Sequence, residues 1–141
     1  MADPDVLPRW PPGTVAVLAT AGGPAHAIPV STALRAGDRR VLIALAPRRE
    51  SLARLRADPR CALALLAAGD IAITAHARAE ILDADLGTVV AVALHVERIQ
   101  DHGTKRFEIE AGVRWRWTDP AAEARDAEVR AALAALSPPA A

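Results

Sequence analysis

The clearest pattern along the chain is the alternation of apolar and polar positions between residues 71 and 82. The odd positions, including Ile71 and Ile81, are apolar, whereas the even positions from Thr74 to Glu80 are polar. A period of two residues is typical of a β-strand that turns one face toward a core. The run at 90–96 alternates in the same way, so the pattern predicts strands at both places.

Other apolar runs are bounded by glycine, proline or aspartate, which favour turns, and they predict further strands. One of them, 26–34, contains Pro29, which has no N–H for a sheet hydrogen bond, so this strand is expected at an edge, bulged or open on one side. The last run alternates aromatic or aliphatic residues with charged ones. The predicted strands cover residues 15–20, 26–34, 40–46, 61–67, 71–82, 90–96 and 107–117.

Two segments carry helical signals. A short helix of about two turns is predicted after Pro47, and Asp58–Pro59 ends it. A C-terminal helix is predicted over 119–136, where Asp119–Pro120 supplies the start. Six or seven short strands, one small helix after the third strand and one final helix describe a mainly β (α+β) fold, an antiparallel barrel with helical plugs. A doubly wound sheet is disfavoured because too few connections are helical.

Composition limits the partners. A chain of 141 residues is expected to form one domain over 1–141, with residues 1–12 as an N-terminal strap. Much of its 52% hydrophobic content is alanine and only 3% is aromatic, so we expect a thin core that subunit association extends. The formal net charge is zero and Lys105 is the only lysine, which gives no support to binding of nucleic acid or an anionic membrane.

Cysteine and histidine usage excludes two further classes. Cys61 is the only cysteine, so no intrachain disulfide can form, and the four histidines are scattered without the spacing of a metal pair. No metal site is expected. Residues 1–5 lack the pattern of a secretory signal and no apolar run is long enough to span a bilayer, so the expected location is the cytoplasm.

The loop between the third predicted strand and the short helix carries the most suggestive chemistry. Arg48, Arg49 and Ser51 offer guanidinium and hydroxyl donors at a helix start, where a phosphate can be held. The same residues are also typical of a solvated turn in which Ser51 or Glu50 helps to begin the helix. Sequence alone leaves both interpretations open.

The order of several motifs resembles that of the pyridoxamine 5'-phosphate oxidase-like split-barrel flavoproteins, over roughly half of the chain or more. The motifs are Leu18–Thr20, Pro24–Val30, Leu55–Arg60 followed by an apolar strand, and Thr74–Glu80. The resemblance implies a homodimer of antiparallel split barrels, with FMN or a related deazaflavin in two equivalent clefts at the subunit interface. It identifies a superfamily better than a reaction.

The resemblance also implies roles for particular residues. The matching positions for the cofactor phosphate are Arg48, Arg49 and Ser51, and the edge of the isoalloxazine ring would face Pro29, Val30, Ser31 and Thr32. Trp115 and Trp117 would close the barrel or build the dimer interface, and Trp115 is a candidate to line the cofactor cleft of the neighbouring subunit. The chain lacks the lysine often found near the start of the small helix, and two arginines can replace it as phosphate ligands.

These observations favour an FMN-binding, or related flavin-binding, oxidoreductase that acts on a small organic molecule. The flavin would supply the redox chemistry, and no side chain is assigned as a catalytic acid or base. An alternative is a split-barrel dimer that binds a flavin or haem without turnover. A third possibility is a cofactor-free dimer that acts only through protein contacts.

Overall fold

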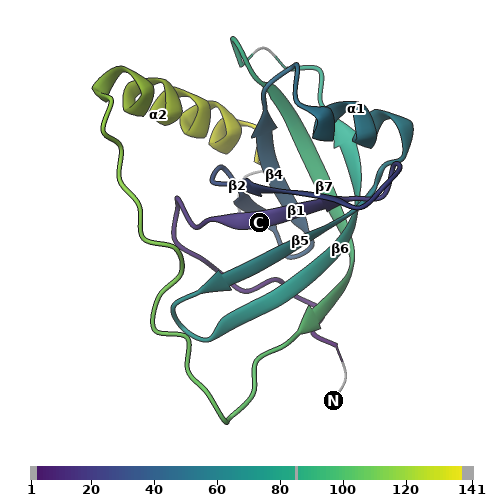
Figure 1. The fold of residues 1–141 in the computed structure, drawn as a ribbon, viewed down its shortest axis with the longest axis vertical. Coiled ribbons are helices and arrows are strands. Elements are labelled where there is room, and N and C mark those ends of the chain that lie inside the picture. Colours follow the sequence, from purple (N-terminus) through teal and green to yellow (C-terminus); the bar gives the residue numbers. More distant parts are fainter. Residues whose placement is uncertain (1–2, 85, 138–141) are drawn as a thin grey trace.

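The computed structural model describes residues 3–84 and 86–137, which form one curled antiparallel sheet and two helices (Figure 1). The strands are β1 (Ala16–Thr20), β2 (His26–Val30), β3 (Leu34–Gly37), β4 (Arg40–Leu45), β5 (Arg60–Ala67), β6 (Ile71–Ile81) and β7 (Val90–Asp101). The helices are α1 (Glu50–Ala57) and α2 (Pro120–Ala135). The predicted mainly β, antiparallel architecture is confirmed.

The strand order explains how the sheet closes. Hydrogen-bonded neighbours follow the order β2-β1-β5-β6-β7-β4-β3, and every pair is antiparallel. The two edge strands, β2 and β3, are consecutive along the chain, and only residues 31–33 connect them. Because such a connection reaches about 14 Å even when fully extended, the sheet has to curl until its edges lie near each other. The gap between these two edges is the split of the barrel.

The single strand predicted at 26–34 is wrong, because this run divides into β2 and β3. β2 stops at Val30 because its partner β1 begins at Ala16, the residue opposite Val30. Pro29 lies in the edge strand β2, as its missing N–H predicts. The division also corrects the position of the short helix, which follows the fourth strand and not the third.

The strand predicted at 107–117 is also wrong, because this segment has no regular secondary structure. Its anchors are isolated: the Ile109 N–H donates to Asp70 Oδ1 at 2.7 Å, and the Trp115 Nε1–H donates to the Gly13 carbonyl at 2.9 Å. A Cβ at Gly112 would lie 2.7 Å from the Leu66 carbonyl oxygen, so glycine allows a close approach there and makes no bulge in a ladder. Anchors of such different kinds do not build the regular pairing of a strand.

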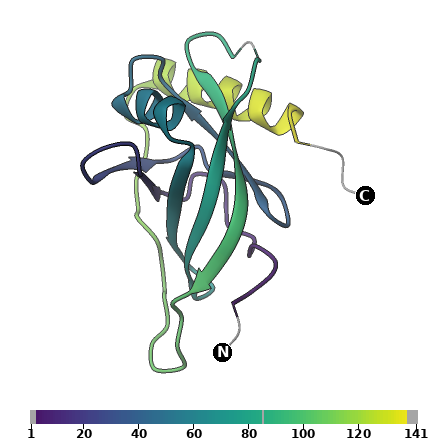
Figure 2. The ribbon, with the colours of Figure 1, turned by 90° about the vertical axis from the view of Figure 1, so that its right-hand side faces the viewer.

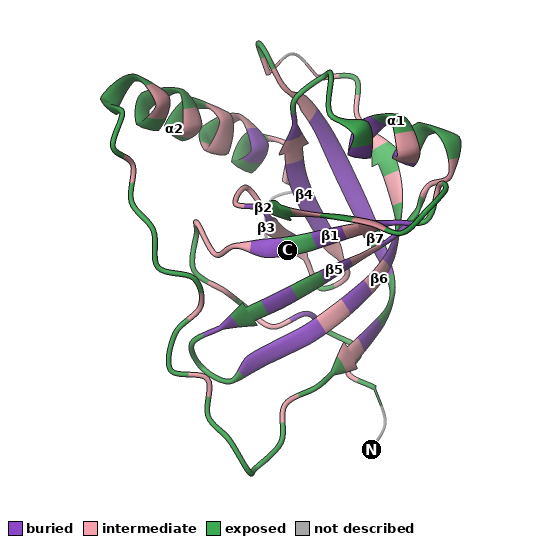
Figure 3. Cartoon of the chain, viewed as in Figure 1, coloured by how far each residue is buried: buried purple, intermediate pink, exposed green. Residues whose placement is uncertain are grey.

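The core lies inside the curled sheet. Buried and exposed residues alternate along β5 (Figure 3), and its inward residues Leu63 and Leu65 are fully buried. Within the predicted strap, the Leu7 N–H donates to the Asp38 carbonyl at the end of the β3–β4 hairpin at 2.8 Å, and the Trp10 Nε1–H donates to the Ala33 carbonyl at 3.0 Å. Residues 1–2 of the strap fall outside the described residues.

α2 belongs to a separate hydrophobic cluster and not to the main core, and Figure 2 shows it crossing the upper end of the sheet. Asp119 begins the helix by accepting a hydrogen bond from the Ala121 N–H at 3.0 Å, so the C-terminal helix predicted at 119–136 is present. Leu133 is its only buried residue, and it packs in a small second cluster against β3, β4 and β7. Neither helix in the described part of the chain is long and apolar enough to cross a membrane.

Candidate functional site

A pocket of about 250 Å³ opens at the split of the barrel, and we call it the split pocket. It is lined by Ile28, Pro29, Val30, Ser31, Thr32, Ala44, Leu45, Ala46, Arg49 and Val89. One wall is therefore the end of β2 with the β2–β3 connection, and the other is the end of β4 with the loop that leads into α1. The four residues expected to face a flavin ring and one of the expected phosphate ligands surround the same cavity.

Two sets of hydrogen bonds hold the β2–β3 connection in place. The Thr32 hydroxyl accepts from the Ala44 N–H at 3.1 Å and lies 3.4 Å from the Ala44 carbonyl oxygen, to which it donates. On the other side, Arg130 of α2 donates from Nη2 to the Ser31 carbonyl at 2.8 Å. The connection is thus tied to β4 and to α2, which fixes the wall of the pocket.

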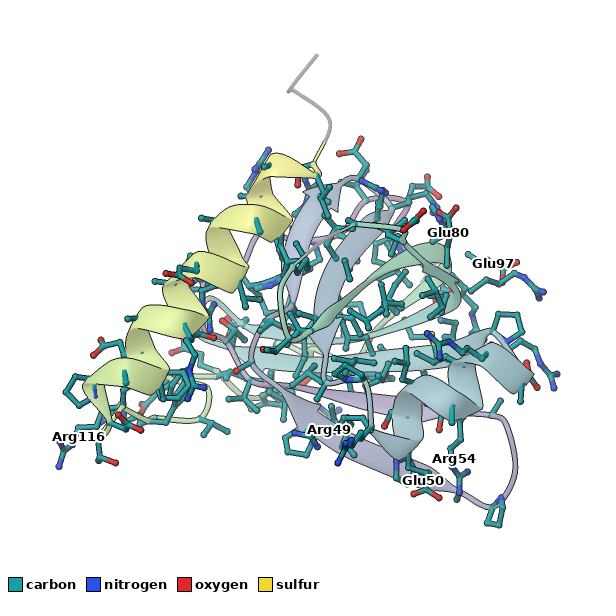
Figure 4. The ribbon with its side chains drawn as sticks, turned by 90° about the horizontal axis from the view of Figure 1, so that it is seen from above. Arg49, Glu50, Arg54, Glu80, Glu97 and Arg116 are labelled. Atoms are coloured by element: carbon teal, nitrogen blue, oxygen red, sulfur yellow. The ribbon has the colours of Figure 1, made fainter. Side chains whose placement is uncertain are left out.

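The start of α1 supplies the positive end of the pocket. Arg49 is the N-cap residue, and no side chain caps the first N–H groups of this helix. Uncapped N–H groups and the helix dipole favour an anion at that position. Figure 4 shows Arg49 beside Glu50 at this corner of the molecule. Arg48 is exposed and is not part of the pocket lining.

Ser51 faces away from the pocket. It is only 1% exposed, and its Oγ lies 3.1 Å from His26 Nε2 on β2. The other ring nitrogen of His26, Nδ1, lies 3.2 Å from Glu50 Oε2, and Glu50 also pairs with Arg54 at 3.3 Å. With Nδ1–H donating to the carboxylate, Nε2 is free to accept the Ser51 O–H. This network joins β2, which forms one wall of the split pocket, to α1, which follows the loop of the other wall.

Trp115 lies outside the split pocket of its own chain. Its ring packs edge-to-face on Trp117, with ring centroids 5.2 Å apart and an interplanar angle of 79°. The expected role of Trp115 concerns the cleft of a neighbouring subunit, so it stays a prediction. Within the described residues, no three His, Cys, Asp or Glu side chains cluster in a way that would hold a metal ion.

No model of a known protein family matches the sequence, and no curated protein matches it. Solved structures, in contrast, do match this chain. A candidate pyridoxamine 5'-phosphate oxidase from Lactobacillus delbrueckii is 16% identical, with a TM-score of 0.54 over 62% of this chain and 84% of that one. The chain adopts the split-barrel fold of the pyridoxamine 5'-phosphate oxidase-like proteins.

Two more split barrels extend the comparison. An FAD-binding protein from Mesorhizobium loti is 16% identical and has a TM-score of 0.52, over 61% of this chain and 83% of that one. A haem-binding protein from Mycobacterium smegmatis is 19% identical with a TM-score of 0.52, over 62% of this chain and 48% of that one. Identities this low establish the fold of the chain and leave its ligand to the chemistry of its own residues.

Cys61 of this split barrel has a perturbed thiol. It is 7% exposed, and burial raises the pKa of the thiol to about 12. Because each pKa unit is a factor of about ten in ionisation, the folded protein should hold almost no thiolate at pH 8. We expect an aromatic disulfide reagent to leave Cys61 unmodified in the native state and to react with one thiol per chain in guanidinium chloride. Rapid modification of the native protein would contradict this assignment.

Proposed function

We propose that this chain is a flavin-binding protein that places the phosphate of FMN at the start of α1 and the flavin ring along residues 29–32. The observation that carries the proposal is the split pocket, where an apolar wall, an arginine and an uncapped helix start meet. A phosphate suits the guanidinium of Arg49 and the free N–H groups, and a flat ring suits the apolar residues Val30, Leu45 and Val89.

The proposed activity is that of an oxidoreductase on a small organic molecule. A bound flavin supplies hydride or electron transfer. The chain would bind and orient it: Arg49 holds the phosphate, and the fixed connection at Ser31 and Thr32 keeps one wall in place. Of the described residues that line the split pocket, none is a histidine, aspartate, glutamate or cysteine. The protein would therefore position the flavin and exclude water from it. It would supply no proton-transferring side chain at this pocket.

We also propose that the protein is a homodimer. Most outward residues of β2, β1 and β5 lie opposite one another in the ladders and form a continuous apolar surface, which Leu66 extends at the end of β5. We call this surface the outer sheet face, and its residues are Val17, Ala19, Ala27, Pro29, Ala62, Ala64 and Leu66. Val17 is 42% exposed and Leu66 is 59% exposed, and exposed apolar residues gathered on one face are typical of an interaction surface. Pro29 belongs both to this face and to the split pocket, so a second copy seated here would wall the cofactor as well.

Removal of the Arg49 guanidinium tests the proposed phosphate site. Charge-assisted hydrogen bonds contribute about 1.5–3 kcal/mol each, so we expect Arg49→Ala to weaken FMN binding by roughly 10- to 150-fold. Arg56→Ala is the matched control, because this exposed arginine lies at the other end of α1. Quenching of flavin fluorescence gives the dissociation constants. Equal affinity in both variants would place the anchor elsewhere, and the absence of any FMN binding by the wild type would contradict the proposal.

A non-catalytic binder is the second candidate function. A haem-binding protein shares the fold, and the split pocket offers no acid or base among its described lining residues. The absorption spectrum of the purified protein, together with mass spectrometry of any bound molecule, distinguishes flavin from haem. If flavin is present, stopped-flow reduction by nicotinamide cofactors separates an oxidoreductase, which turns over, from a binder, which does not.

A further inference from the structure

A second cavity adjoins the split pocket beneath α2, and we call it the α2 pocket. Its volume is about 260 Å³, and it is lined by Thr32, Ala44, Thr88, Val89, Trp117, Ala122, Arg125, Asp126 and Val129. Thr32, Ala44 and Val89 line both cavities. A molecule in the α2 pocket would therefore lie next to whatever the split pocket holds. That is the position that a substrate of a bound flavin requires.

The walls of the α2 pocket suit a flat, apolar ring. Val89 and Val129 provide aliphatic surface, and Trp117 provides an aromatic one. The indole of Trp117 is held in place, because Trp115 packs against it edge-to-face at 5.2 Å and is itself hydrogen-bonded to the Gly13 carbonyl. A fixed aromatic ring binds another planar ring at little cost in conformational entropy.

The charges at the α2 pocket favour an anion. Asp126 is already paired, since its Oδ2 accepts from Arg130 Nε at 2.5 Å. Arg130 also donates to the Ser31 carbonyl, so this pair is part of the wall. Arg125 is exposed, and no acidic side chain pairs with it in the part of the chain that the structure describes. Among the lining residues, the guanidinium of Arg125 is therefore the charge without an opposite partner. A guanidinium binds carboxylates and phosphates in a bidentate manner.

We propose that the α2 pocket is the substrate site, and that it takes a planar organic anion whose ring contacts Trp117 and whose carboxylate or other acidic group binds Arg125. Arg49 lines only the split pocket and Arg125 lines only the α2 pocket, so each cavity has its own guanidinium. Figure 4 shows α1 with Arg49 and the start of α2 at separate corners of the molecule, with the sheet between them. The role as substrate site rests on the proposed function, whereas the binding of the anion does not.

The test uses naphthoate as a planar anion and naphthalenemethanol as its uncharged counterpart, both titrated by calorimetry into the full protein without added flavin. We expect naphthoate to bind at least tenfold more tightly than the alcohol. Arg125→Gln should weaken naphthoate by about tenfold and leave the alcohol unchanged, and Trp117→Leu should weaken both. Arg116→Gln is the matched control, because this exposed arginine lies near the start of α2 and lines neither pocket (Figure 4).

Two results would overturn the proposal: equal naphthoate affinity in the wild type and Arg125→Gln, or loss of naphthoate binding in Arg49→Ala with retention in Arg125→Gln. The second result would place the anion in the split pocket. FMN titrations of the same variants keep the two proposals separate, because Arg125→Gln should bind FMN like the wild type. A protein that binds naphthoate through Arg125 but never binds FMN would retain the anion site and lose the proposed flavin function.

Discussion

The substitution Leu66→Glu is expected to leave the protein folded but monomeric. Leu66 points outward near the end of β5, at the border of the apolar outer sheet face, and is 59% exposed in a single chain. If a second copy covers this face, the substitution places an unpaired carboxylate in an apolar interface, which costs several kcal/mol per subunit. The same carboxylate is solvated in the monomer and costs little there. The equilibrium therefore shifts toward monomer by several orders of magnitude.

Sedimentation velocity over a range of protein concentrations measures this shift, and circular dichroism checks that the fold is retained. Val6→Glu is the matched control, because Val6 is 48% exposed but belongs to the N-terminal strap and not to the outer sheet face. It should remain dimeric. A monomeric wild type, or a Leu66→Glu protein that stays dimeric, would rule out this face as the interface. Pro29 borders the split pocket, so FMN affinity should fall together with dimerisation in Leu66→Glu.

The long strands could be predicted because one of their faces is buried. In β6 the alternation of apolar and polar residues corresponds to inward and outward side chains, and the interior selects the apolar ones. The segment 107–117 alternates just as clearly and is not a strand. Alternation shows which side chains are apolar. It does not show whether a neighbouring strand is present to form hydrogen bonds with the backbone. The same limit applies to 26–34, where β2 ends because β1 provides no residue beyond Ala16.

Most of the split pocket could be predicted only through the resemblance to split-barrel flavoproteins. Pro29, Val30, Ser31, Thr32 and Arg49 do line one cavity. The curl of the sheet brings them together, and no local pattern in the sequence encodes that curl.

The burial of Ser51 and the existence of the α2 pocket were not predicted, for different reasons. Ser51 is buried together with Leu55, one helical turn further on, so helical spacing contains a signal that Ser51 shares the inward face of α1. The α2 pocket had no such signal. Its walls come from Thr32, Trp117 and Arg125, which are far apart along the chain and meet only because α2 packs against β3 and β4.

Removal of the His26 ring should destabilise the fold through Ser51. The Ser51 hydroxyl is buried on α1, and His26 on β2 is its hydrogen-bond partner at 3.1 Å. His26→Ala leaves this hydroxyl without its partner, a situation that costs about 1–3 kcal/mol. Ser51→Ala removes the hydroxyl itself and should cost less. In the double variant the hydroxyl is absent, so the loss in unfolding free energy should be smaller than the sum of the two single losses.

Urea unfolding at a fixed protein concentration measures the four free energies, and a fixed concentration is required because association contributes to stability. His95→Ala is the control: this histidine is exposed and pairs with Glu80 at 2.9 Å on the outside of the barrel. Its removal should change the unfolding free energy by less than about 0.5 kcal/mol, as is usual for exposed ion pairs. Strict additivity of His26→Ala and Ser51→Ala would show that the two side chains are energetically independent. A coupling would show instead that one partly buried hydrogen bond fastens β2, a wall of the split pocket, to the helix whose start is the proposed phosphate site.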